Sequence, residues 1–267
     1  MKIREAKEME KAESNYFVNS VAKGFAVLTA FDSSNNTMSL SELEKKTGIN
    51  KATVRRFALT LVDLGYLVLT EDNKFKLSPK VLDLAAHYLE SLNLPDLAHP
   101  ILERISSTIK ESTNLAVLDD ADIVYVLRVS AAKRIIGTNL RVGSRLPYYA
   151  TSLGKALVAW LPAEERKAIW KKAEVEAFTD YTITDFDKLE VNFEDCRRKG
   201  YAEGNDELEV GLRSIAIPIF NKNGEAIAAI NISTNSMRTS EDKIKEEFLP
   251  LLRGGAEEMN RFMKSFC

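Results

Sequence analysis

The sequence predicts an α+β protein with an N-terminal winged helix-turn-helix, a connector helix and a C-terminal antiparallel sheet flanked by helices. Three observations carry this prediction. Short amphipathic segments and an apolar hairpin occupy residues 20–78, a helical segment that begins with Ser-Pro covers 79–94, and hairpins alternate with long helices over 95–267. We expect residues 1–19, which are charged and non-periodic, to form a flexible arm.

The bulk composition is that of a soluble globular protein: 267 residues, 45% hydrophobic and 28% charged side chains, and a net charge of −2. No apolar run reaches the roughly 18 residues of a membrane-spanning helix, and the charged start is unlike a secretory signal. We therefore expect a cytoplasmic protein without membrane contact. The two cysteines and two histidines show no metal-binding spacing, so we expect no metal, cofactor or disulfide.

The segment at 20–31 and the one that follows it predict two helices separated by the loop DSSNNTM. In the first, apolar side chains recur near helical spacing at Val21, Phe25, Leu28 and Phe31. In SLSELEKKTG, Ser39 precedes Glu42 by three residues, which is the signature of a capping box. Gly48 then predicts the end of this second, short helix.

The stretch GINKATVRRFALTLVDLGYL predicts a third helix, from about 51 to 64, that Asn50 can cap. Its apolar residues fall on one face, at Val54, Phe57, Ala58, Leu61 and Leu64. Next come YLVLT and FKLS, two short apolar segments on either side of the polar turn EDNK. Such a pair predicts a β-hairpin, which after three helices would be the wing.

Positive charge gathers around this third helix, because five cations and no acid lie between Glu44 and Asp63. Charge alone would favour an ordinary solvated helix face. The order of short helix, glycine turn, capped helix and wing instead favours a recognition helix that enters the major groove of operator DNA. Lysine and arginine neutralise phosphates, and arginine also binds guanine. The candidate DNA-binding residues are Ser39, Lys51, Thr53, Arg55, Arg56, Asn73 and Lys74.

The second half mixes long helices with hairpins, which predicts an antiparallel sheet covered by helices. Helical patterns occupy 94–113, 151–161, 162–173, a segment near 185–199 and the end of the chain from about 239. NLAVLDDADIVYVLRV predicts two strands with a turn at 119–122, and RIIGTNLRVGSRLPYYA predicts a strand that runs into a loop. LRSIAIPIFNKNGEAIAAINIST predicts a hairpin around 221–224.

These segments resemble the IclR family of bacterial transcriptional regulators. SVAKGFAVLTAF, SLSELEKKTGINKATVRRFALTLVDLGYL and FKLSPKVLDLAAHYLESL are similar to its N-terminal domain. LAVLDDADIVYVLRV, VGSRLPYYATSLGKALVAWLP and GLRSIAIPIFNKNGEAIAAINIST are similar to its effector-binding domain. ATVRRFALTLVDLGY, LSPKVLDLA and ELEVGLRSIAIP most resemble the branch that regulates aromatic-acid catabolism through the β-ketoadipate pathway. Members of that branch respond to protocatechuate, 4-hydroxybenzoate or β-ketoadipate.

The resemblance implies a GAF-like second domain, in which a six-stranded antiparallel sheet carries a small-molecule pocket on one face. It also implies a homodimer formed through the DNA-binding domain, and often a homotetramer formed through the effector domains. The family's pocket residues fall here on Ser152, Leu153, Asn205, Ser214, Asn231 and Ser233. Residues two apart on a strand face the same way, and N–H groups at the start of the 151–160 helix can hold a carboxylate. Many relatives carry an acid at the Asn205 position, which Asp206 follows here, and some carry a cysteine at Ser214, so the ligand's identity stays open.

Together the residues predict a non-enzymatic regulator whose DNA binding is modulated by a small organic acid. Arg134, at the head of a strand in the same region, is a further candidate carboxylate partner, with a solvated strand end as the alternative. Two alternative functions stay open: an enzyme with an accessory DNA-binding domain, and a DNA-binding protein whose second domain only oligomerises. TSLGKA lacks the full pattern of a phosphate loop, and NDELE favours a solvated turn over a metal or acid–base site.

Overall fold

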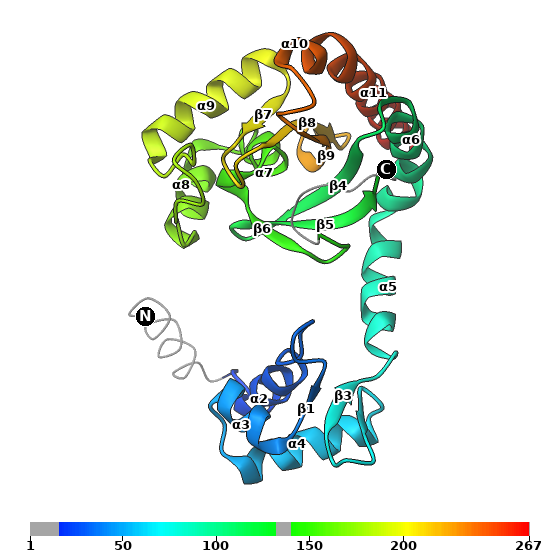
Figure 1. The fold of residues 1–267 in the computed structure, drawn as a ribbon, viewed down its shortest axis with the longest axis vertical. Helices are drawn as coiled ribbons and strands as arrows, with labels where there is room; N and C mark the ends of the chain where they lie inside the picture. Colours follow the sequence, from blue (N-terminus) through cyan, green and yellow to red (C-terminus); the bar gives the residue numbers. More distant parts are fainter. Residues whose placement is uncertain (1–15, 132–139, 267) are drawn as a thin grey trace. The chain divides into compact units, whose positions relative to one another are not determined.

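The computed structural model describes residues 16–131 and 140–266 and divides the chain into two compact units, 1–91 and 92–267 (Figure 1). The boundary falls inside the segment 79–94, which the sequence assigns to the connector helix. The described part of the first unit holds three helices, a small sheet and most of the helix that follows at Val81–Leu92, and the second unit holds an antiparallel sheet with helices on both faces. The predicted α+β class, with a winged helix-turn-helix followed by a helix-flanked antiparallel sheet, is confirmed.

Three helices pack together in the described part of the first unit; the second and third begin at their predicted capping residues, whereas no side chain caps the first. They are α2 (Asn19–Leu28), α3 (Leu40–Thr47) and α4 (Lys51–Asp63). The capping box of α3 is formed, since Ser39 Oγ accepts from Glu42 N and Ser39 N donates to Glu42 Oε2 at 2.7 Å. Gly48 ends α3 in the left-handed conformation with φ of 68°.

The wing is a three-stranded sheet and not the two-stranded hairpin that the sequence predicts. Strands β2 (Leu67–Leu69) and β3 (Phe75–Leu77) form the expected hairpin. A short strand, β1 (Thr37–Met38), pairs with the other edge of β3, in the order β1-β3-β2. The loop predicted for DSSNNTM includes these two residues, because a two-residue strand has no periodicity and forms only against its partner.

The core of the first unit differs from the predicted apolar faces at three positions. Val21 and Phe25 are 56% and 58% exposed, and Leu64 at the end of α4 is 54% exposed. The side of α2 that packs on α4 instead carries Gly24, whose missing Cβ would lie 3.8 Å from Phe57 Cδ1. The buried core consists of Val27, Ala30, Met38, Leu43, Val54, Ala58, Leu67 and Phe75.

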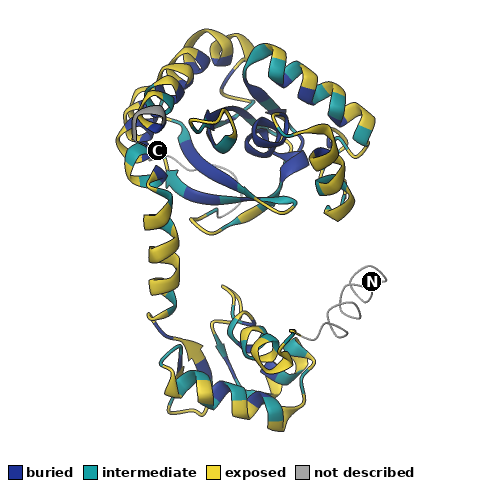
Figure 2. Cartoon of the chain, turned by 180° about the vertical axis from the view of Figure 1, so that it is seen from behind, coloured by how far each residue is buried: buried dark blue, intermediate teal, exposed yellow. Residues whose placement is uncertain are grey.

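Helix α5 (Val81–Leu92) follows the wing and contains no buried residue. Its start is fixed by Ser78, whose hydroxyl donates to Gly65 O and accepts from Lys80 N at 3.1 Å. Asn93, with φ of 52°, separates α5 from α6 (Leu94–Ile109). Figure 2 shows α5 in the colours of exposed and intermediate residues along its whole length.

The sheet of the second unit has six antiparallel strands in the order β6-β5-β4-β9-β8-β7, as the resemblance implies. The strands in chain order are β4 (Ser112–Asp119), β5 (Asp122–Val129), β6 (Arg145–Pro147), β7 (Ala202–Asn205), β8 (Leu212–Phe220) and β9 (Ala226–Asn235). The predicted turns lie at Asp120, with φ of 54°, and at Gly224, with φ of 80°. Both hairpins are therefore confirmed.

Two layers of helices cover this sheet. One face packs on α6 and on α11 (Leu249–Phe266), which follows α10 (Glu241–Lys243) and a π-helical turn (Ile244–Phe248). The other face packs on α7 (Ser152–Val158), with α9 (Phe186–Lys199) outside it, and α8 (Ala163–Lys172) lies between them in sequence. Figure 2 shows the strands beneath these helices as the most buried part of this unit.

Side-chain size differs along the face that meets α7. Buried alanines at 116, 202, 216 and 229 lie beneath α7 and let the helix approach the strands closely. Because side chains alternate along a strand, the residues two positions away from these alanines, toward the start of α7, face the same way. Those positions carry no alanine: three have polar side chains, at Asn114, Ser214 and Asn231, and the fourth is Gly204. The tight packing therefore stops at the start of α7, and a cavity opens there.

Candidate functional site

The first candidate surface is the exposed N-terminal half of α4. Asn50 caps this helix, since its Oδ1 accepts from Thr53 N at 3.0 Å. Lys51, Arg55 and Arg56 are exposed, whereas Thr53 is half-buried. Lys51 Nζ contacts Ser41 Oγ at 3.0 Å, and no acidic side chain in the described chain pairs with Arg55 or Arg56. The two arginines therefore present their charge to solvent at the end of a helix.

The wing turn contributes the second part of this surface. Asn73 lies at its tip with φ of 56°, a conformation that asparagine tolerates better than most residues. Lys74 Nζ lies 3.4 Å from Asp72 Oδ2, and the hydrogen bond from Thr70 lowers the pKa of Asp72. Ser39 lies elsewhere, in the capping box of α3, where its hydroxyl donates to Glu42 at 2.7 Å.

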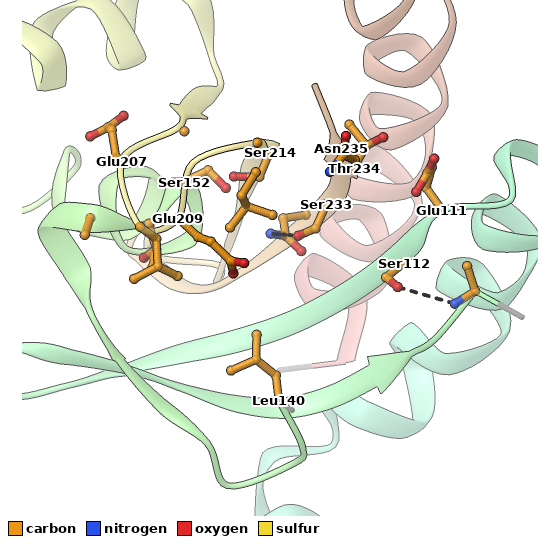
Figure 3. A pocket seen from close by; sticks show the side chains of 18 of the residues that line it. Glu111, Ser112, Leu140, Ser152, Glu207, Glu209, Ser214, Ser233, Thr234 and Asn235 are labelled. Atoms are coloured by element: carbon orange, nitrogen blue, oxygen red, sulfur yellow. Dashed lines mark hydrogen bonds between the residues drawn. The ribbon is translucent and has the colours of Figure 1, made fainter. Parts of the chain in front are cut away.

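The second candidate site is a cavity of about 370 Å³ between the sheet and the start of α7. This volume lies within the range of small-molecule pockets. Strands β4, β8 and β9 form its floor, and Ala150, Thr151 and the loop after β7 form its rim. Figure 3 shows Leu140 on the opposite side of the cavity from Ser214 and Ser233. The lining thus combines polar and apolar side chains.

Four of the predicted effector-binding residues line this cavity: Ser152, Ser214, Asn231 and Ser233. Asn231 Nδ2 donates to Ser233 Oγ at 3.1 Å, as expected for two residues on the same side of β9 (Figure 3). Ser152 Oγ is buried and has no hydrogen-bond partner in the described chain.

The other three predicted residues do not line the cavity or cannot be placed. Leu153 is fully buried and packs in the hydrophobic core around α7. Asn205 is exposed, and its neighbour Gly204 lines the cavity in its place, because adjacent residues of a strand face opposite ways. A Cβ at Gly204 would lie only 2.8 Å from Ser214 Oγ. Arg134 lies outside the described residues.

Strand pairing brings further polar residues to the cavity that no local pattern in the sequence indicates. The register of the sheet places Ser112, Ser233, Ser214 and Gly204 in one row across four strands. The neighbouring row holds Arg128, Asn114 and Asn231. Side chains directly opposite one another on paired strands lie on the same face, so each row forms one continuous strip. Arg128 and Ser112 are separated by 16 positions in the sequence and give no local signal.

Charge and apolar surface complete the cavity. Arg128 and Arg238 bring positive charge to it, and Glu111, Glu207 and Glu209 bring negative charge. Glu111 pairs with Arg238 at 3.2 Å, and Glu207 pairs with Lys155 at 2.5 Å. Tyr125 also lines the cavity, where burial raises the pKa of the phenol to about 12. The tyrosine is therefore neutral at physiological pH. The cavity can hold a small molecule that carries an acidic group at one end and apolar surface at the other.

A winged helix-turn-helix joined in one chain to a domain with a small-molecule cavity defines the class of one-component transcriptional regulators. The sequence profile of the IclR helix-turn-helix domain matches residues 20–70, and that of the bacterial transcriptional regulator IclR C-terminal domain matches residues 86–261. The chain belongs to the IclR family of bacterial DNA-binding transcriptional regulators with an effector-binding C-terminal domain.

Relatives and solved structures agree with this assignment. The Pca regulon regulatory protein of Pseudomonas putida is 36% identical over 91% of this chain and 83% of its own length. The p-hydroxybenzoate hydroxylase transcriptional activator of Acinetobacter baylyi is 31% identical over 95% of each chain. An IclR homolog from Microbacterium hydrocarbonoxydans, solved in complex with 4-hydroxybenzoate, is 25% identical, with a TM-score of 0.80 over 92% of this chain and 99% of its own.

These relatives decide between the functions that the sequence left open. They are transcriptional regulators, so the enzyme alternative is rejected. The C-terminal domain matches an effector-binding domain, so the purely oligomerising alternative is rejected as well. No helix in the described ranges is long and apolar enough to cross a membrane.

Proposed function

We propose that the effector is a small organic acid, aromatic or derived from aromatic ring cleavage, bound in the cavity beside α7. The single observation that carries this proposal is that serine hydroxyls and two arginines line the cavity together with apolar side chains, while two of its three lining carboxylates are paired with cations. A carboxylate is a strong partner for hydroxyl and guanidinium donors, and an apolar ring fits the apolar side chains. The names of the relatives, which include a p-hydroxybenzoate hydroxylase activator and a 4-hydroxybenzoate complex, support the same class of ligand.

We propose that Ser152, Ser214, Asn231 and Ser233 contact the acidic group, with Arg128 supplying positive charge. Thermal unfolding of the full chain with 4-hydroxybenzoate, protocatechuate, β-ketoadipate and pyruvate tests the ligand class. A ligand at one hundred times its Kd should add about 2.7 kcal/mol to the free energy of unfolding. Ser214→Ala should weaken this stabilisation, whereas Ser236→Ala, outside the cavity lining, serves as the matched control. No stabilisation by any acid would contradict the proposal.

We propose that the domain at 20–78 binds operator DNA through Lys51, Thr53, Arg55, Arg56, Asn73 and Lys74, with Ser39 ordering the preceding helix. The exposed arginines of α4 and its capped N-terminus support this assignment. On an operator selected from random duplexes, Arg55→Ala should lower affinity and relax specificity at one base pair by about 1–3 kcal/mol. Lys51→Ala should mainly reduce the dependence of affinity on salt.

A control variant distinguishes the loss of contacts from α4 from a general loss of positive charge. Lys167→Ala removes an exposed lysine of α8 in the effector domain and should leave operator affinity unchanged. Equal binding by the wild type, Arg55→Ala and Lys51→Ala at matched salt would exclude the docking assigned to α4.

We also propose that the protein acts as a homodimer in the cytoplasm, where operator DNA lies. Phe25 and Val21 lie one turn apart on α2 and are more than half exposed, so together they offer adjacent apolar surface to a second copy of the chain. Phe25→Glu should shift sedimentation equilibrium from dimer toward monomer, whereas Lys23→Glu on the same helix should not. A Phe25→Glu variant with unchanged mass would exclude α2 from the dimer interface. A tetramer formed through the 95–267 domains would appear as a second, concentration-dependent species.

We propose that the effector shifts the equilibrium between arrangements of the DNA-binding domains, with the segment at 79–94 as the link. An effector does so only if it binds one arrangement more tightly than the other. By reciprocity, operator DNA must then change effector affinity by the same factor. Measuring effector affinity with and without operator tests this directly, and equal values would exclude thermodynamic coupling.

A further inference from the structure

A chain of hydrogen bonds runs across three strands beneath the cavity. Arg128 Nη1 on β5 donates to Asn114 Oδ1 on β4 at 3.0 Å. Asn114 Nδ2 donates to Asn231 Oδ1 on β9 at 2.7 Å. Asn231 Nδ2 then donates to Ser233 Oγ at 3.1 Å. Asn114 is fully buried and, unlike the other three residues, does not line the cavity.

The direction of this chain is fixed by its first member. A guanidinium can only donate, so the oxygen of the Asn114 amide must face Arg128. The amide nitrogen of Asn114 must then face Asn231 and requires an acceptor there. This places the Asn231 oxygen toward Asn114 and the Asn231 nitrogen toward Ser233. Each amide has one possible orientation as long as Arg128 and Asn114 are both present.

The last member of the chain therefore has a defined polarity toward the cavity. Ser233 Oγ uses a lone pair to accept from Asn231, which leaves its proton to be donated elsewhere. Ser112, directly opposite on β4, likewise accepts from Ala131 N at 3.3 Å and keeps its proton (Figure 3). Two hydroxyl protons side by side match the two oxygens of one carboxylate.

We propose that Asn114 is a positioning residue that fixes Ser233 as a hydrogen-bond donor and so makes the cavity select a carboxylate over the corresponding carboxamide. This inference rests on the proposed function, because it concerns the same ligand. A carboxylate offers acceptors at both oxygens, whereas a carboxamide brings two protons of its own to one of these hydroxyls. The preference thus originates in a buried side chain that does not touch the ligand.

Two substitutions at Asn114 test the inference with 4-hydroxybenzoate and 4-hydroxybenzamide as probes of the full chain. Asn114→Leu interrupts the series of hydrogen bonds without adding charge. The amide of Asn231 can then adopt either orientation, and the preference for the acid should decrease. In Asn114→Asp the carboxylate accepts hydrogen bonds from both Arg128 and Asn231. The amide of Asn231 therefore reverses, and Ser233 must donate to its oxygen. The ratio of acid to amide affinity should then fall at least about tenfold, the effect of one hydrogen bond to a charged group.

A double-substitution cycle separates positioning from a general structural effect. Ser233→Ala should weaken acid binding in the wild type but cost much less in the Asn114→Leu background, because the donor is no longer fixed there. Thr113→Val is the matched control: Thr113 is the buried neighbour of Asn114 on the other face of β4, and its hydroxyl donates to Leu102 O at 3.0 Å. This variant should lose stability while keeping the wild-type ratio of affinities.

The outcomes distinguish this inference from the function on which it rests. If the wild type binds the acid and both Asn114 variants keep its affinity ratio, the positioning role is wrong and the organic-acid effector stands. Additive effects of Asn114→Leu and Ser233→Ala would also overturn the positioning role. If no organic acid binds the wild type, both proposals fail. Should Asn114→Asp not fold, Asn114→Leu and the cycle decide alone.

Discussion

The Nζ atom of Lys155 lies 2.5 Å from Oε1 of Glu207, and both side chains are buried. The ion pair joins α7 to the loop that follows β7, on the rim of the cavity. The stretch NDELE, which contains Glu207, predicts a solvated turn, and for Glu207 this prediction is wrong. The loop is held further by Thr182, whose hydroxyl donates to Glu207 O at 2.6 Å.

Removing one partner of this pair should destabilise the protein strongly. Lys155→Met leaves the Glu207 carboxylate buried without its cation, at a cost of about 3–5 kcal/mol in the free energy of unfolding. The double variant Lys155→Met/Glu207→Leu should recover most of that loss, because neither charge remains. Urea unfolding measures the free energy of unfolding of the single and the double variant. A single variant as stable as the wild type would mean that water reaches the carboxylate.

Gly154 should tolerate no side chain. A Cβ at this position would lie 2.3 Å from the Cα and the carbonyl oxygen of Tyr148, and neither backbone atom can move independently. Gly154→Ala should therefore cost at least about 3 kcal/mol or prevent folding. Gly254→Ala, in α11 with no atom within 4 Å of the added Cβ, is the control. It should stabilise the protein by about 0.5–1 kcal/mol. Thermal unfolding should therefore show that the two substitutions change stability in opposite directions.

The stability of the protein at alkaline pH should depend on Tyr125. Burial raises the pKa of this side chain from 10.0 to about 12. Between these two pH values the unfolded chain has lost the phenolic proton that the folded chain keeps. The free energy of unfolding should thus fall by up to about 1.4 kcal/mol per pH unit from this group. Tyr125→Phe should flatten this slope in denaturant titrations above pH 10. An unchanged slope would show that Tyr125 ionises without unfolding.

Cys196 should be unreactive in the folded protein. It is buried in α9, and burial raises the pKa of its thiol to about 11, so little thiolate forms at neutral pH. In a Cys267→Ser background, a thiol reagent such as DTNB at pH 8 should modify Cys196 only as fast as the protein opens. Denaturant should make the reaction rapid and complete. Fast modification without denaturant would show that α9 opens locally.

Local signals in the sequence predicted most of the elements correctly. The capping residues Ser39, Asn50 and Gly48 mark the ends of α3 and α4 because they satisfy backbone groups within a few residues. The hairpin at 221–224 follows from its turn residues in the same way. The pocket residues came from the family resemblance and not from such signals. Ser214, Asn231 and Ser233 line the cavity, whereas Gly204 does so in place of Asn205.

Features that depend on pairing between distant segments could not be predicted. The exposure of Phe25 and the burial of Val27 depend on which side of α2 meets α4. Strand β1 depends on the free edge of β3. Neither the Lys155–Glu207 pair nor the Asn114–Asn231 hydrogen bond gives a local pattern, because 52 and 117 positions separate their partners.

The sequence by itself determined most of the secondary structure, the helix-turn-helix with its hairpin and the family, because caps, turns and periodicity act over a few residues and the family's motifs are contiguous stretches of sequence. Only the tertiary structure decided what surrounds the ligand. Strand register placed Arg128, Asn114 and Asn231 in one row and the serines in the next, and the start of α7 left the space above them. Hydrogen bonds across a sheet are set by which strands pair and in what register, which no short stretch of sequence specifies.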